Sequence, residues 1–193
     1  MRILIIDPQF EAEPDVERAV TGPEAEIVVW RTAERGPVPT SEFALCDALI
    51  NCRSRHVVTR EIVAAMERCR IVSQAGVGFN HIDLVACAER GIPVCNAPDY
   101  GTTEVADHAL GLVLALTRGI VAYDAKLRSR AMGWDARAQL TVRRLRGAAF
   151  GVLGLGRIGT AAALRAKGFE MEVAFCDPYL TAGTERAFGF RRC

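Results

Sequence analysis

A glycine-rich turn followed by an acidic residue is the clearest chemical pattern in this sequence. Gly154, Gly156 and Gly159 form a G-x-G-x-x-G spacing directly after the apolar run 148–153, and Asp177 comes 18 residues after the last glycine. In a strand–turn–helix unit the first glycine permits a tight turn and the second lets a pyrophosphate approach the backbone. The third lets the helix pack closely on the strand. The spacing therefore predicts a dinucleotide-binding turn, with a purely structural turn as the alternative.

Asp177 also indicates which dinucleotide is bound. At the end of an expected strand over 172–176, its carboxylate would accept hydrogen bonds from the adenosine ribose hydroxyls, and its charge would repel a 2′-phosphate. The residues that follow, Pro178 and Tyr179, offer no arginine that could receive such a phosphate. The sequence therefore favours NAD over NADP.

Alternating strands and helices would position these residues. Short apolar runs predict strands over 2–6, 26–30, 47–52, 71–73 and 92–95, with amphipathic helices over 14–20, 59–69 and 81–90. This alternation predicts a parallel sheet covered by helices. One long helix is expected from Thr102 to about Arg130, and a second β-α-β unit over 148–176. The polar segment between them, which contains Trp134, Arg137 and Arg143, is interpreted as a surface excursion with a solvated arginine face.

The composition excludes several classes of protein. The 193 residues are 50% hydrophobic and carry 24 Lys and Arg against 23 Asp and Glu, which gives a net charge of +1. Proteins that bind nucleic acid or membrane surfaces usually carry a basic excess, so neither partner is expected. No apolar run approaches the roughly 20 residues of a membrane-spanning helix, and the first eight residues do not form a signal peptide. A cytoplasmic protein is predicted.

The cysteines are interpreted as reduced core thiols. There are seven, an odd number, and no C-x-x-C pair occurs. Most lie within apolar runs, such as those that end in Cys95 and Cys176. This pattern is not typical of a disulfide framework or a zinc site, and no metal site is predicted.

Several further motifs resemble one enzyme family. They are the stretches 75–83 (AGVGFNHID), 91–98 (GIPVCNAP), 104–108 (EVADH), 145–180 with the glycine turn, and 183–189 (GTERAFG). From about residue 45 onward the chain resembles the NAD-dependent D-isomer-specific 2-hydroxyacid dehydrogenases, and within them it is most similar to the C-terminal-binding-protein group.

The resemblance implies an α/β protein with doubly wound parallel sheets. Residues 1–100 would form a flavodoxin-like substrate domain, and 101–193 the first part of a Rossmann NAD-binding domain. The ligands would be NAD and a 2-hydroxy or 2-keto acid. The implied site residues are Val77 and Gly78 at the substrate carboxylate through their backbone N–H groups, Arg53 facing the substrate, Val77 and Val105 near the nicotinamide, and Arg157 and Ile158 along the pyrophosphate. Arg53 as a solvated residue at a strand end remains an equal alternative.

The resemblance also implies a catalytic Arg, Glu and His that follow the Rossmann acid in the family. The sequence ends at Cys193, so no catalytic residue is assigned, and the chain is expected to be an inactive N-terminal fragment. Three alternatives are open: part of a dehydrogenase, a dinucleotide-sensing dimeric scaffold, and a truncated gene product. A homodimer is expected through the helix that begins at Thr102.

Overall fold

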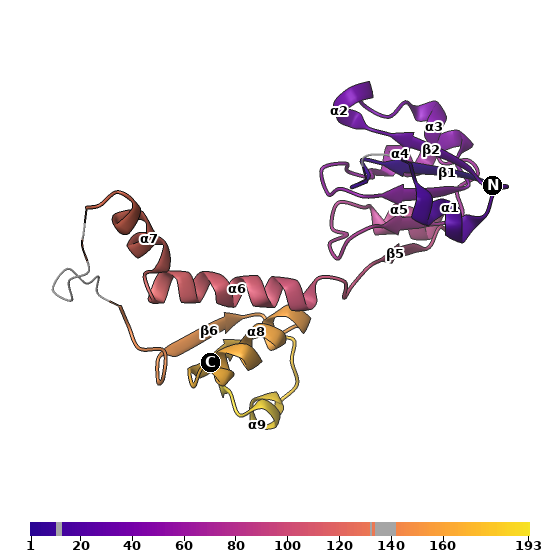
Figure 1. Cartoon of the computed structure of the whole chain (residues 1–193). Coiled ribbons are helices and arrows are strands. Elements are labelled where there is room, and N and C mark those ends of the chain that lie inside the picture. Colours follow the sequence, from indigo (N-terminus) through magenta and orange to yellow (C-terminus); the bar gives the residue numbers. More distant parts are fainter. Residues whose placement is uncertain (11–12, 132, 134–141) are drawn as a thin grey trace. The chain divides into compact units, whose positions relative to one another are not determined.

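The computed structural model describes residues 1–10, 13–131, 133 and 142–193. The chain divides into two compact units, Met1–Tyr100 and Gly101–Cys193, which are described separately below. Figure 1 shows the elements of both units. Of the expected surface excursion, Trp134 and Arg137 lie outside the described residues.

The first unit is built on a parallel sheet of five strands. Their order is β2-β1-β3-β4-β5. The strands are β1 (Arg2–Ile6), β2 (Glu26–Trp30), β3 (Ala48–Asn51), β4 (Val72–Gln74) and β5 (Val94–Asn96). This is the flavodoxin-like order, in which the direction of winding reverses between β1 and β3. Ligands of such sheets bind beyond the carboxyl ends of the strands, so the loops at that edge matter most.

The side chains of β1 explain why helices cover both faces of this sheet. Ile3 and Ile5 belong to one buried apolar cluster, whereas Leu4 and Ile6 belong to another. Successive residues of a strand point to opposite faces, so this continuous apolar run must be buried on both sides. The helices of the unit are α1 (Asp15–Thr21), α2 (Thr32–Arg35), α3 (Thr40–Leu45), α4 (Arg60–Ala65) and α5 (Leu84–Glu89).

The second unit contains a three-stranded parallel sheet. Its order is β6-β7-β8, with strands β6 (Ala149–Leu153), β7 (Glu172–Cys176) and β8 (Arg191–Arg192) and helices α6 (Thr102–Thr117), α7 (Ile120–Arg128), α8 (Arg157–Gly168) and α9 (Thr184–Phe188). Small buried residues, among them Ala106, Ala163 and Ala166, join Phe175 in its core. Such residues let α6 and α8 approach each other closely. The predicted α/β class with parallel sheets is therefore confirmed in both units.

The prediction of one long helix from Thr102 to about Arg130 is wrong. The chain forms α6 and α7 instead, which are bent by 57° relative to each other. Gly119, between them, adopts a left-handed φ of 65°, a conformation that commonly ends a helix. In the described part of the chain no single helix is long and apolar enough to cross a membrane, and this bent pair passes that test by length and composition only.

The interpretation of the cysteines as core thiols holds for only part of the set. Cys46, Cys69 and Cys87 are buried and Cys52 is half-buried, but Cys95, Cys176 and Cys193 are exposed. Cys95 lies in β5, at the edge of its sheet, and Cys176 is the last residue of β7. An apolar run is buried only where other elements cover it, and these positions lie at the margins of their sheets.

Candidate functional site

The glycine turn connects β6 to α8 and uses two of its glycines for backbone reasons. Gly154 has a φ of 85°, which favours glycine, and its N–H donates to the carbonyl of Cys176 over 2.9 Å. A Cβ on Gly159 would lie 2.1 Å from the carbonyl oxygen of Gly154 and 3.2 Å from Cγ1 of Val152. No side chain fits there, so the first turn of α8 packs directly on the end of β6.

The backbone of the turn is open at Gly156 and at the N-terminus of α8. A Cβ on Gly156 would meet no described atom within 4 Å. No described side chain caps the N-terminus of α8 by a hydrogen bond, and its first turn holds no acidic residue. Arg157 is exposed and Ile158 is half-buried. A helix N-terminus with an open approach suits an anion because its N–H groups and the helix dipole both face that side.

Asp177 follows β7 and is attached to the same turn. Its Oδ2 accepts the N–H of Leu155 over 2.8 Å, and its Oδ1 accepts the N–H of Tyr179 over 3.0 Å. Each carboxylate oxygen can accept further hydrogen bonds, so the acid is held in place without being saturated. The structure thus brings the candidate residues Gly154, Gly156, Gly159 and Asp177 together at the carboxyl ends of β6 and β7.

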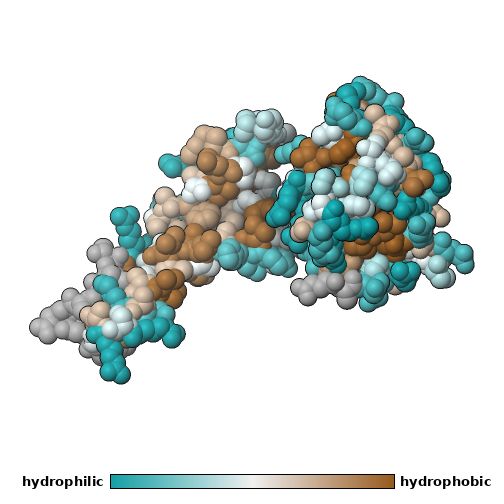
Figure 2. All heavy atoms as spheres, turned by 90° about the horizontal axis from the view of Figure 1, so that it is seen from above, coloured by the Kyte–Doolittle hydropathy of each residue, from teal (hydrophilic) through white to brown (hydrophobic). Residues whose placement is uncertain are grey.

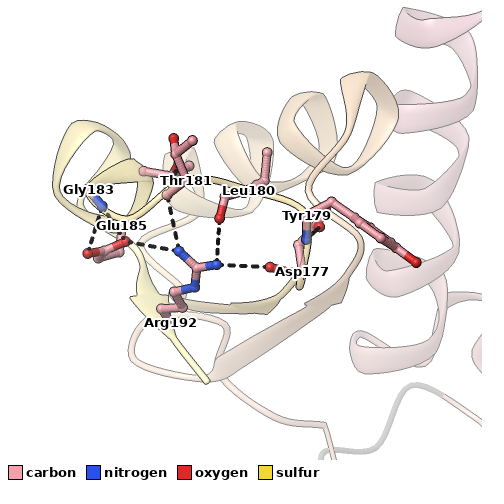
Figure 3. A network of polar contacts seen from close by, with 8 residues as sticks. Asp177, Tyr179, Leu180, Thr181, Gly183, Glu185 and Arg192 are labelled. Atoms are coloured by element: carbon pink, nitrogen blue, oxygen red, sulfur yellow. Dashed lines mark hydrogen bonds and ion pairs between the residues drawn. The ribbon is translucent and has the colours of Figure 1, made fainter.

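Arg192 was missed by the sequence analysis, and it lies against the loop that carries Asp177 (Figure 3). Its Nη2 donates to the carbonyls of Asp177 over 3.1 Å and Leu180 over 2.8 Å. Its Nη1 donates to the carbonyl of Thr181 over 3.1 Å. Arg192 belongs to β8, which pairs in parallel with β7. A strand predicted over the last residues would have signalled this position, because parallel strands end at the same edge.

Glu185 is the ionic partner of Arg192. Its Oε2 lies 3.7 Å from Nη1 of Arg192, and its carboxylate accepts the N–H of Gly183 over 3.1 Å. Hydrogen bonds from its own backbone N–H and from that of Gly183, aided by the charge of Arg192, lower the pKa of Glu185 below its ordinary value. Glu185 is therefore an anion that offsets the positive charge of the guanidinium.

The candidate substrate residues of the first unit follow β3 and β4. Arg53 is exposed and lines a hollow of about 260 Å³ together with Asp7, Arg31 and Arg55. Val77 is 40% exposed. Its carbonyl accepts Nδ2 of Asn96 over 2.8 Å. The remaining candidate, Val105, lies in the other unit on the exposed side of α6.

A buried polar cluster beneath these loops was also missed. Nδ2 of Asn51 donates to Oε1 of Gln74 over 3.1 Å and to the carbonyl of His56 over 3.2 Å. Nε2 of His81 lies 2.8 Å from the same Gln74 oxygen. An amide oxygen only accepts, so Nε2 of His81 carries a proton. The cluster links the loops after β3 and β4, and only the burial of two polar strand ends could have indicated it.

His56 lies in the exposed loop after β3, but its own side chain is half-buried. Its ring stacks on Phe43 with centroids 5.9 Å apart, and burial lowers its pKa below the ordinary value. Its Nε2 is buried without a hydrogen-bond partner among the described residues. Those residues contain no group of three or more His, Cys, Asp or Glu side chains suited to a metal ion.

Comparison with known proteins identifies the family. Residues 3–188 match the model of the D-isomer specific 2-hydroxyacid dehydrogenase family, catalytic domain. The chain is 34% identical over 189 residues to D-3-phosphoglycerate dehydrogenase of Methanocaldococcus jannaschii. This alignment covers 98% of this chain and 34% of that protein. It is 40% identical over 149 residues to the chloroplastic D-3-phosphoglycerate dehydrogenase 2 of Arabidopsis thaliana, covering 77% of this chain and 23% of that one.

Solved structures agree with this assignment. The 2-hydroxyacid dehydrogenase of Ketogulonicigenium vulgare Y25 is similar at a TM-score of 0.77 with 30% identity, over 100% of this chain and 58% of that one. The D-lactate dehydrogenase of Aquifex aeolicus, in complex with NAD and lactic acid, shares the fold at a TM-score of 0.83 with 24% identity, over 99% of this chain and 55% of that one. The chain belongs to the D-isomer specific 2-hydroxyacid dehydrogenase family. It spans about a third of the length of the first curated relatives.

Proposed function

We propose that the chain binds NAD and a 2-hydroxy or 2-keto acid for an oxidoreductase that transfers a hydride between them. The second unit is the cofactor domain and the first unit is the substrate domain. The cofactor roles fall to Gly154, Gly156 and Gly159 at the turn, Arg157 and Ile158 along the pyrophosphate, Asp177 at the ribose, and Val77 and Val105 near the nicotinamide. We also propose a cytoplasmic location, since all seven cysteines carry free thiols, which suits a reducing compartment.

One observation carries the cofactor assignment. Asp177 accepts the N–H of Leu155 inside the glycine turn, so an acid adjoins the turn whose Gly156 has no described atom within 4 Å of a Cβ position. A structural glycine turn would not require an acid at that place. The combination is what a dinucleotide needs at its pyrophosphate and its adenosine ribose.

The substrate assignment is supported by the loops after β3 and β4. A Cβ on Gly78 would meet no described atom within 4 Å, so a ligand can approach the backbone of Val77 and Gly78, whose adjacent N–H groups suit a carboxylate. Arg53 makes no ion pair with any described residue, and its guanidinium can pair with the same acid in two-point fashion.

Two measurements test these assignments separately. NADH titrated into this chain, followed by cofactor fluorescence, is expected to saturate; no binding would contradict the cofactor role. NADH oxidation with glyoxylate, hydroxypyruvate and pyruvate, measured on the longest product of the gene, tests the activity. No turnover with any of them would contradict the oxidoreductase role while leaving cofactor binding intact.

The choice of NAD over NADP has its own test. Replacing Asp177 by Ala removes the acceptor for the ribose hydroxyls and the charge that repels a 2′-phosphate. The variant is expected to bind NADH about tenfold more weakly and to lose most of its discrimination against NADPH. Unchanged selectivity in the titration would show that Asp177 does not face the ribose.

A dimeric, dinucleotide-sensing scaffold of the C-terminal-binding-protein kind is the second candidate. The motifs at 104–108 and 183–189 support that subgroup. The observation that favours assembly is a set of apolar side chains exposed on α6 and α7, which are Leu112, Leu116, Ile120 and Val121. A scaffold should assemble more strongly with NAD than without it. Sedimentation that is independent of NAD would favour the dehydrogenase.

A further inference from the structure

We propose that Arg192 is a positioning residue that sets the choice between NAD and NADP. Arg192 binds the backbone carbonyls of the loop 177–181, so that Asp177 stays fixed at the glycine turn. Glu185 neutralises the charge of Arg192, so that this charge does not attract a 2′-phosphate. This inference rests on the proposed cofactor role and extends it to a residue outside the turn and its acid. Arg192 touches neither the ribose nor the turn and acts through Asp177.

The geometry of the guanidinium explains how one side chain fixes this loop. Its two terminal nitrogens donate to the carbonyls of Asp177, Leu180 and Thr181, as Figure 3 shows. The guanidinium carbon also lies 5.8 Å from the centre of the buried Phe175 ring. A planar guanidinium that packs on a ring presents several donors in fixed directions, so it can bind several carbonyls at once. The single ammonium of lysine does not reproduce this geometry.

The loop matters because it supplies one of the two hydrogen bonds that orient the acid. Oδ1 of Asp177 accepts the N–H of Tyr179, whose position depends on the carbonyls that Arg192 holds on either side. Oδ2 is held by Leu155 of the glycine turn. If the loop moves, Asp177 keeps only one of these contacts and its carboxylate can rotate away from the ribose.

The charge balance explains why an arginine at this edge does not create an NADP site. An unpaired guanidinium near the adenosine ribose would attract a 2′-phosphate. The side chains of Arg192 and Glu185 are both less than a third exposed, at 29% and 28%, and lie 3.7 Å apart. Their charges cancel, so the negative charge of Asp177 determines the local preference.

The experiment compares four proteins by titration with NADH and with NADPH. Arg192→Met is expected to weaken NADH binding about tenfold and to reduce the difference between the affinities for NADH and NADPH. Arg192→Lys is expected to weaken NADH binding as well, because a single ammonium keeps the charge but does not reproduce the fork of hydrogen bonds to the loop. Arg191→Met, the matched control on the same strand, should behave as wild type, because Arg191 has no polar side-chain contact with a described residue.

A double-mutant cycle separates positioning from general stability. In an Asp177→Ala background, Arg192→Met should cause almost no further loss of NADH affinity, since the group that it positions is gone. Additive losses would overturn the inference. If circular dichroism shows that Arg192→Met does not fold, Glu185→Gln replaces it in the test. This variant keeps the hydrogen bonds from Arg192 to the carbonyls and leaves the charge of Arg192 without its partner. An unchanged NADPH to NADH ratio in that variant would overturn it too.

The outcomes for the inference and for the proposed function differ. A wild-type chain that binds neither cofactor contradicts the cofactor role itself and, with it, the role of Arg192. A wild-type chain that binds NADH, with Arg192→Met matching it in affinity and selectivity, contradicts only the role of Arg192.

Discussion

Gly159 shows how strictly a single residue can be determined by its surroundings. A Cβ at this position would stand 2.1 Å from the backbone oxygen of Gly154, and backbone cannot yield as a flexible side chain can. Gly159→Ala must therefore push α8 away from β6. We expect this variant to lose about 3 kcal/mol of unfolding free energy and to bind NADH much more weakly, as measured by urea unfolding and by titration.

Gly168, at the end of the same helix, is the control for this change. A Cβ there would meet no described atom within 4 Å. Gly168→Ala should stay within about 1 kcal/mol of wild type, with any change toward higher stability. Equal losses in both variants would show that the loss does not come from the close contact between position 159 and Gly154.

The same comparison shows what the sequence predicts at the scale of residues. The spacing of three glycines and one acid predicted their common turn, because that geometry depends on neighbours within one β-α-β unit. Arg192 and the buried pair of Asn51 and Gln74 could not be predicted in this way. Their contacts join residues from different strands, so they depend on which strands lie side by side.

At the scale of elements, Asp47 connects the starts of β1 and β3. Its Oδ2 accepts the N–H of Arg2 over 2.7 Å, and its Oδ1 accepts Nη2 of Arg68 over 2.9 Å. Its own N–H donates to the carbonyl of Arg2 over 2.8 Å. The backbone hydrogen bond from Arg2, followed by the hydrogen bond and charge of Arg68, lowers the pKa of Asp47 below its ordinary value.

This shift predicts a pH dependence of stability. The folded protein prefers the charged carboxylate, so the contribution of Asp47 is fully present above its ordinary pKa of about 3.9 and is lost as the pH falls through the lower folded value. Asp47→Asn should therefore destabilise the first unit at pH 7, and the difference from wild type should shrink near pH 3. Urea unfolding at both pH values measures this.

Glu67→Gln is the control for that pH series. Glu67 is an exposed acid of the same unit that forms no ion pair with any described residue. Its replacement should change stability little at either pH. A destabilisation by Asp47→Asn that stays constant down to pH 3 would show that the hydrogen bonds of Asp47 do not depend on its charge.

The elements themselves were predicted unevenly for a physical reason. Strands such as β1 and β2 have the predicted bounds because a run of large apolar residues must enter a core. The break between α6 and α7 was missed because the apolar pattern continues across it, and only the left-handed conformation of Gly119 interrupts the helix. The short α2 and α3 were missed too, since four to six residues give too little periodicity to detect.

At the scale of the whole molecule, exposed apolar surface on the second unit predicts a contact between two copies of the chain. Figure 2 shows hydrophobic surface in brown over its helices. Leu116 is 81% exposed at the end of α6, and Val121 is 70% exposed on α7. Isolated apolar residues on a surface need no explanation, but a contiguous set is typical of an interface. A twofold dimer would bury the set against its own copy.

Leu116→Glu tests this contact against a control of similar exposure. Val20, on α1 of the first unit, is 83% exposed, so Val20→Glu makes a similar change outside the second unit. We expect the wild type and Val20→Glu to sediment as dimers. Leu116→Glu should sediment as a monomer, because the dimer would bury a charged glutamate from each copy without a partner. A monomeric wild type would contradict the dimer, and a dimeric Leu116→Glu would place the contact elsewhere.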